Sequence, residues 1–145
     1  MESAIAPVVI FGNMTITKTP PKPRNRHHSQ PEAVIQAACV KWLWNNYPET
    51  RGNFIHIPNE GNRSSAIDGS LRKALGLVAG APDTFLFMAR GGYHGLAVEF
   101  KSLDGRQRDE QMEFQKRMEL NGYRYELCRS EDQFHSIIAD YLSKK

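Results

Sequence analysis

Two short apolar runs separated by a glycine-rich reversal constrain this chain more than any other feature. Thr84–Met88 and Leu96–Phe100 are each bounded by turn residues, which is typical of buried strands. The segment RGGYHG between them supplies the residues that a tight reversal needs. The stretch therefore predicts a β-hairpin of two buried strands, around which the rest of the chain has to pack.

The charged residues of this hairpin are predicted to gather at one end. Alternation along the second strand places Glu99 and Lys101 on one face and Phe100 on the other. Asp83 comes just before the first strand, so folding the hairpin back brings its carboxyl group toward Glu99 and Lys101. Two converging carboxylates suit a hard cation such as Mg²⁺ or Mn²⁺. A lysine beside them can orient a water molecule or offset charge on a transferring phosphoryl group.

Five sequence features together resemble a known nuclease family. Pro82-Asp83 followed by Glu99-Phe100-Lys101 matches the PD-(D/E)xK nuclease motif, and the wider pattern resembles the virus-type replication-repair nuclease module, VRR-NUC. That wider pattern adds Glu32 on a leading helix, the segment HIPNEG at 56–61, Gly80 before the PD pair and a downstream Gln111. The resemblance covers residues 29–145. Each piece alone occurs by chance in many proteins, but their combination in this order is specific.

The resemblance implies a fold and a metal site. The fold would be a restriction-endonuclease-like α/β core, in which helices flank a mixed β-sheet. Asp83 and Glu99 would hold Mg²⁺ or Mn²⁺, joined by Glu32 and by the backbone carbonyl of Phe100. Lys101 would position the nucleophilic water or stabilise the transition state.

The resemblance also implies contacts to nucleic acid and a substrate class. Gln111 would hydrogen-bond a substrate phosphate or the attacking water, while Asn59 and Arg63 would border the cleft. The implied activity is metal-dependent endonucleolytic hydrolysis of phosphodiester bonds in DNA, on branched or structured substrates such as Holliday (four-way) junctions, in a phage-type DNA repair protein. Symmetric cutting of a junction needs two active sites, which favours a homodimer. Two alternatives stay open: a non-catalytic DNA-binding or recombination accessory module, and a nuclease that acts on RNA.

The net charge of +3 is unevenly distributed. Residues 1–30 contain four lysines and arginines against Glu2 alone, whereas the remainder carries equal numbers of acidic and basic residues. The sequence therefore divides into a basic, proline-rich arm (1–28), expected to be extended or disordered, and a nuclease-like domain (29–145). Arg24 and Arg26 of the arm are candidate phosphate contacts, although a solvated tail explains them equally well. Within the arm, 8–16 has the pattern of a short hairpin.

The rest of the chain predicts alternating helices and strands. Helices are expected at 29–46, 65–75, 106–121 and from 130 onward, with strands at 54–57 and 123–128 beside the two of the hairpin. The resulting order is α-β-α-β-β-α-β-α. A strand–helix–strand unit after Lys101 favours a mixed sheet with helices on both faces.

Three candidate site residues have simpler explanations. Glu32 completes an S-x-x-E capping box with Ser29, which by itself requires no function. Gln111 lies at helical spacing from Gln107 and Gln115, so the three can form a polar stripe that faces solvent. His56 in a strand is more often packed than functional. For Glu32 and Gln111 the resemblance favours the active-site role.

Composition and cysteine content exclude other classes. The chain has no apolar run near the length of a membrane span and lacks the features of a secretory signal. Cys39 and Cys128 lie within apolar patterns and are expected to pack as small hydrophobic residues rather than form a disulfide or a metal site. These features favour a reducing cytoplasmic compartment, either bacterial or in a phage-infected cell.

Overall fold

The computed structural model describes residues 31–58 and 66–145. Its elements in chain order are α1 (Glu32–Asn46), a 3-10 turn (Pro48–Thr50), β1 (Phe54–His56), α2 (Ala66–Ala74), β2 (Thr84–Leu86), β3 (Leu96–Phe100), α3 (Asp109–Leu120), β4 (Arg124–Cys128) and α4 (Glu131–Ser143). Apart from the short 3-10 turn, this is the predicted order. The arm at 1–28, including Arg24, Arg26 and the expected hairpin at 8–16, lies outside the described residues, as do Asn59 and Arg63.

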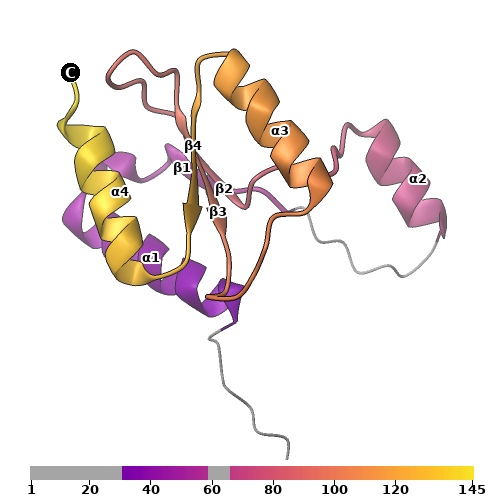
Figure 1. Cartoon of the computed structure of the whole chain (residues 1–145), viewed down its shortest axis with the longest axis horizontal. Coiled ribbons are helices and arrows are strands. Elements are labelled where there is room, and N and C mark those ends of the chain that lie inside the picture. Colours follow the sequence, from indigo (N-terminus) through magenta and orange to yellow (C-terminus); the bar gives the residue numbers. More distant parts are fainter. Residues whose placement is uncertain (1–30, 59–65) are drawn as a thin grey trace, which may run out of the picture.

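The four strands form one mixed sheet in the order β1-β2-β3-β4 (Figure 1). β1, β2 and β3 pair antiparallel, with Thr84 opposite Val98, while β3 and β4 run parallel, with Glu99 opposite Leu127. The parallel pair is joined by α3, which supplies the crossover that parallel strands require. The predicted α/β fold with a mixed sheet is confirmed.

Helices cover both faces of the sheet. On one face, α1 and α4 pack against Leu96, Val98 and Phe100, which are fully buried. On the other, Phe85, Ala97 and Tyr125 form a smaller cluster against Met118 of α3. Consecutive residues of β3 therefore point to opposite faces, as predicted. This alternation places Glu99 and Lys101 on the α3 face and separates them from the larger core.

The helix starts differ in part from prediction. Ser130 caps α4, because its Oγ accepts the N–H of Gln133 at 3.2 Å. Pro31 precedes α1 without a side-chain cap, and Ser29 of the expected capping box lies outside the described residues. Within α1, Ile35 and Leu43 are buried against the sheet, whereas Val34 is exposed.

Helix α3 begins three residues later than predicted, at Asp109. The side-chain Oε1 of Gln111 accepts the backbone N–H of Arg108 at 3.0 Å, which satisfies a donor that no helical carbonyl reaches. Gln107 therefore lies ahead of the helix. Its Nε2 still donates to Oε1 of Gln115 at 2.9 Å, so the two side chains lie together along the start of α3.

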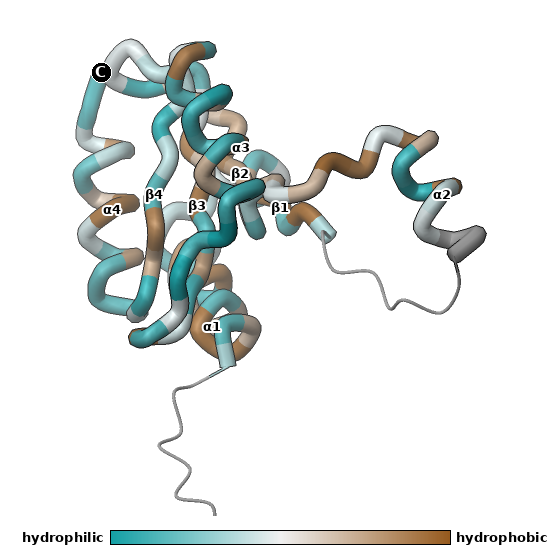
Figure 2. The backbone as a smooth tube through the Cα atoms, turned by 45° about the vertical axis from the view of Figure 1, so that its right-hand side comes forward, coloured by the Kyte–Doolittle hydropathy of each residue, from teal (hydrophilic) through white to brown (hydrophobic). Residues whose placement is uncertain are grey.

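Helix α2 stands apart from the sheet in both overall views (Figures 1 and 2). Leu71, within it, and Leu75 and Val78, just after it, are among the most exposed large apolar residues of the described chain. A nine-residue helix is too short to be stable alone in water, since isolated helices become marginal below about 12–15 residues. This apolar segment therefore lacks a covering partner within the described part of one chain.

Both cysteines behave as expected from the sequence. Cys39 and Cys128 are buried in the main core, and neither forms a disulfide. Across residues 31–58 and 66–145, no helix combines the length and apolar character that spanning a bilayer requires.

Candidate active site

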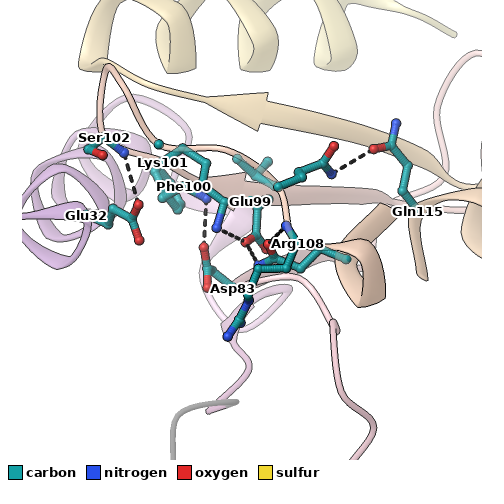
Figure 3. A network of polar contacts seen from close by, with 12 residues as sticks. Glu32, Asp83, Glu99, Phe100, Lys101, Ser102, Arg108 and Gln115 are labelled. Carbon is teal, nitrogen blue, oxygen red and sulfur yellow. Dashed lines mark hydrogen bonds and ion pairs between the residues drawn. The ribbon is translucent and has the colours of Figure 1, made fainter. Parts of the chain in front are cut away.

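Asp83 and Glu99 meet where the hairpin ends (Figure 3). Asp83 directly precedes β2, and its Oδ2 accepts the backbone N–H of Phe100 at 2.7 Å. The side chain thus continues the β2–β3 ladder beyond its last backbone pair, Thr84 with Val98. This hydrogen bond fixes the carboxyl group of Asp83 beside the end of β3, where the sequence predicted it.

Glu99 is buried and surrounded by donors. Its side chain is 1% exposed, and its Oε1 accepts hydrogen bonds from Nζ of Lys101, at 2.9 Å, and from Nε2 of Gln111. The Tyr125 hydroxyl lies 3.5 Å from the other carboxylate oxygen. Burial raises the pKa of Glu99, and the charge of Asp83 raises this pKa further, while the contact with Lys101 lowers it.

The pKa of Asp83 is also raised, chiefly by burial. The N–H of Phe100 and the charge of Lys101 oppose this shift, and the charge of Glu32 adds to it. A carboxyl group whose pKa is raised on folding opposes the folded state once pH exceeds its ordinary pKa, because the unfolded chain then holds the ionised form more easily. Near neutral pH, a cation between Asp83 and Glu99 would offset this cost.

The carboxylate oxygens of this site fit a hard cation that takes few ligands from the protein and keeps several waters. No group of three histidine, cysteine or carboxylate side chains able to hold a metal occurs among the described residues. Two carboxylates nevertheless suit Mg²⁺, which usually keeps several waters and takes only one or two protein carboxylates. The predicted pair, Asp83 and Glu99, is therefore adequate in chemistry, while Glu32 does not join them in such a cluster.

Gln111 lies in the site and not on a solvent-facing stripe. It is 3% exposed and sits at the third position of α3. Its Oε1 is occupied by the N–H of Arg108, so its Nε2 faces Glu99. The simpler explanation from the sequence, a polar stripe that faces solvent, is therefore wrong for Gln111. The first turn of α3 directs this side chain toward the sheet and not toward solvent.

Glu32 reaches the same edge of the sheet from α1. Its Oε1 accepts the backbone N–H of Ser102 at 3.1 Å (Figure 3). This contact ties the first turn of α1 to the residue that follows Lys101. The carboxylate therefore borders the site, and its charge is felt by Asp83.

Arg129 is a site-supporting residue that sequence reasoning missed. Its Nη1 donates to the carbonyls of Ser102, at 2.7 Å, and Gly105, at 2.6 Å. One guanidinium group thus holds the loop that contains Ser102, whose backbone N–H donates to Glu32. No sequence signal marks Arg129, because an arginine between a strand and a helix is ordinary.

Gly80 allows the segment that leads to Asp83 to lie against the start of α3, which carries Gln111. Its φ of +81° lies in the left-handed region. A Cβ at this position would lie 2.7 Å from the backbone nitrogen of Gln111, and closer still to the carbonyl of Glu110. The chain leading to Asp83 therefore touches the first turn of α3, and only glycine permits that approach.

The sequence suggested that His56 is a packed strand residue, but the structure shows otherwise. It is exposed, and its Nδ1 lies 2.9 Å from the backbone oxygen of Asp83 and 2.9 Å from Nε2 of Gln36. It links β1 and α1 to the turn that carries Asp83. Sequence alternation alone did not reveal this contact, because β1 is an edge strand with one open side.

Comparisons with known proteins identify the family and support the fold. The family model of the VRR-NUC domain matches residues 30–132. A solved structure described as a VRR-NUC domain protein has 23% sequence identity and a TM-score of 0.70, over 81% of this chain and 92% of that chain. A comparison with curated proteins found no significant match. Because the family match spans well over half of the sequence, the chain belongs to the VRR-NUC family, whose domain is of the nuclease type.

Proposed function

We propose that this protein is a metal-dependent endonuclease that hydrolyses phosphodiester bonds in branched or structured DNA. The observation that carries the proposal is the convergence of Asp83, Glu99 and Lys101 at the end of the central hairpin, with Gln111 hydrogen-bonded to Glu99. A buried lysine–carboxylate pair is expensive to maintain for stability alone. Its placement beside a second desolvated carboxylate favours catalysis.

Asp83 and Glu99 would hold Mg²⁺ or Mn²⁺, with the Phe100 carbonyl as a further ligand, while Glu32, which borders the site, would contact the ion through a bound water. In a strand, the N–H and C=O of one residue point toward the same neighbour. Because the N–H of Phe100 faces Asp83, its carbonyl faces the same side. The bound ion would lower the pKa of water and stabilise charge on the phosphoryl group.

Lys101 and Gln111 would act on the water and the phosphate. The ammonium group of Lys101 has three N–H donors, and its contact with Glu99 uses one of them. Gln111 likewise has two N–H donors on Nε2 and directs one toward Glu99. The remaining donors can orient the attacking water or hydrogen-bond a non-bridging phosphate oxygen.

Contacts away from the cleaved bond would come from segments outside the described residues. Asn59 and Arg63 follow β1, whose end lies beside Asp83, so they would meet the phosphate backbone near the site. Arg24 and Arg26 of the basic arm would add salt-dependent affinity for DNA. The buried free cysteines are compatible with a reducing cytoplasm, bacterial or phage-infected, where we place the protein.

A cleavage panel tests the proposal. Labelled single strands, duplexes, flaps, splayed arms and four-way junctions would be incubated with Mg²⁺, with Mn²⁺ or with EDTA. We expect internal cuts with either metal, none in EDTA, and the fastest cutting on a branched member. Asp83→Ala should show no cutting, because it removes both a metal ligand and the hydrogen bond to Phe100.

The same panel separates the alternative functions. Tight binding of a branched member without cutting in either metal would favour an accessory module. Faster cutting of ribonucleotide versions would point to RNA as the substrate. Cutting that survives in Asp83→Ala would place the chemistry elsewhere or reveal a contaminant. A rise in melting temperature on adding Mg²⁺ to the wild type, absent from Asp83→Ala, would show metal binding independently of activity.

We further propose that two copies associate through the α2 segment, by which we mean α2 and the residues that follow it as far as Val78. Leu75, just after α2, is 78% exposed, and Leu71 and Val78 are exposed beside it. A second copy offers the same apolar segment, which is the self-complementary contact of a two-fold dimer. Covering α2 in this way would also stabilise a helix that is too short to persist alone.

The mass in solution tests this assembly. Leu75→Glu should convert a dimer into a monomer, because it places a charge in the apolar contact. Leu120→Glu is the matched control, since Leu120 is 87% exposed at the end of α3 and lies outside the α2 segment. Multi-angle light scattering would measure both variants. A monomeric wild type, or a Leu75→Glu dimer, would contradict the proposal.

A further inference from the structure

A pocket of about 600 Å³ lies between α1 and the edge strand β1. Its floor is apolar and comes from α1, where Ala33, Ala37 and Val40 share the lining with Trp44. The Trp44 side chain is 37% exposed. Trp42, two residues earlier, is instead stacked on His135 with a centroid distance of 3.8 Å. One tryptophan thus supports the fold, while the other presents its ring to the pocket.

The rim of this pocket is cationic. Lys41 and Arg51 line it, and none of the described lining residues is an aspartate or glutamate. Arg51 is positioned by its Nε, which donates to the backbone carbonyl of Trp44 at 3.1 Å. The guanidinium group is therefore tied to the backbone of α1 at Trp44, and Arg51 forms no ion pair with an acidic side chain among the described residues. An apolar floor with an aromatic side chain and unneutralised cations matches a nucleotide, whose base is flat and whose phosphate is anionic.

The pocket adjoins the candidate active site. Gln36 lines it and lies one helical turn after Glu32 on the same side of α1. His56 lines it from β1, and its Nδ1 contacts both Gln36 and the backbone oxygen of Asp83 at 2.9 Å. These two side chains form the wall between the pocket and the carboxylates. A strand bound for cleavage at Asp83 therefore passes close to this pocket.

We propose that the pocket binds one unpaired nucleotide of the DNA substrate, next to the bond that is cut. The base stacks on Trp44, and Lys41 and Arg51 contact its phosphate. A paired base cannot enter, because its faces are covered by its neighbours in the duplex. The inference rests on the proposed nuclease function and adds a structural preference to it: the substrate carries an unstacked base near the cleaved bond.

Binding measured in EDTA tests the pocket without requiring catalysis. The probes are a blunt duplex, the same duplex with a short single-stranded thymidine tail of either polarity, and the tailed duplexes with abasic sites. Fluorescence anisotropy gives each affinity. We expect Trp44→Ala to weaken binding of a thymidine-tailed duplex about 5- to 150-fold, the range for loss of base–aromatic stacking. Binding of the blunt and abasic probes should change little.

Matched variants separate the pocket from general effects on folding and charge. Tyr93→Ala removes an aromatic residue of nearly equal exposure, 38%, from the turn between β2 and β3, and should leave every affinity unchanged. Trp44→Phe keeps an aromatic ring and should retain most of the tail preference. Lys41→Gln should lower the salt dependence of tail binding by about one phosphate contact, whereas Lys116→Gln, on the exposed side of α3, should not.

Two results would overturn the inference. One is a wild type that binds tailed and blunt duplexes equally; the other is a Trp44→Ala variant that loses the same affinity for thymidine and abasic tails.

Cleavage in Mg²⁺ is measured separately, so that failure of the pocket and failure of the nuclease proposal can be distinguished. If the wild type cuts DNA but Trp44→Ala shows no tail-specific loss, the pocket inference fails and the nuclease proposal holds. If tail-specific binding is present but no probe is cut, the nuclease proposal fails and the pocket remains.

Discussion

Replacing Lys101 with methionine should lower the rate of DNA cleavage about 100- to 1,000-fold, the usual effect of removing one preorganised donor from a charged transition state. Methionine replaces the apolar stem of the lysine side chain, which is 9% exposed, and removes only the ammonium group. Affinity for DNA should change little, because one buried ammonium group contributes less to binding than the exposed cations. Single-turnover cleavage in Mg²⁺, together with binding in EDTA, measures the two effects separately.

Lys101→Met also has a consequence for stability that identifies its partner. Without the ammonium group at 2.9 Å, Glu99 remains buried with no cationic partner, which should cost about 3 kcal/mol of unfolding free energy. Combining Lys101→Met with Glu99→Gln removes both charges, so stability should return while activity stays lost. Urea unfolding of the single and double variants in EDTA provides this comparison. Equal destabilisation in both would show that the pair is not coupled.

Changing Gln111 to glutamate should abolish most activity while keeping the start of α3 intact. A glutamate at this position can still accept the N–H of Arg108, as Oε1 of Gln111 does at 3.0 Å. In its ionised form it cannot donate to Glu99, and it places a second carboxylate where Nε2 now lies. We expect cleavage to fall about 100-fold, consistent with loss of one buried donor. Gln111→Ala, which loses both contacts, should additionally weaken the helix.

The stability of Gln111→Glu should depend on pH in a defined direction. Burial already raises the pKa of Glu99, and a neighbouring carboxylate raises it further. The folded variant therefore retains a proton that the unfolded chain releases, so its deficit relative to wild type grows as pH rises above the ordinary glutamate range. Thermal melts in EDTA should show a larger deficit near pH 8 than near pH 5. A deficit that does not vary with pH would contradict a direct contact between the two carboxylates.

The sequence predicted the centre of the site because local rules determine it. Strand alternation alone placed Glu99 and Lys101 opposite Phe100, and the hairpin placed Asp83 beside them. The structure confirms both, since Phe100 lies in the main core while Asp83 accepts its N–H. Turn residues and apolar periodicity were likewise enough to order the helices and strands.

The supporting contacts were not predictable, because they join residues far apart in the chain. Arg129 contacts carbonyls of the loop at 102–105, and Ser102 contacts Glu32 through its backbone nitrogen. Backbone donors and acceptors exist at nearly every residue, so the sequence does not show which ones are used. The exposed position of His56 likewise depended on β1 forming the sheet edge, which only the strand order reveals.

The chain joins α2 to the candidate active site through one short segment, which contains Gly80. His56 precedes this part of the chain and contacts the backbone oxygen of Asp83, and the chain returns from α2 through Gly80 to Asp83, so both ends lie at the candidate site. At Gly80 it presses against the backbone that carries Gln111. If two copies associate through α2, as proposed above, their contact would therefore bear on how Asp83 is aligned with Gln111.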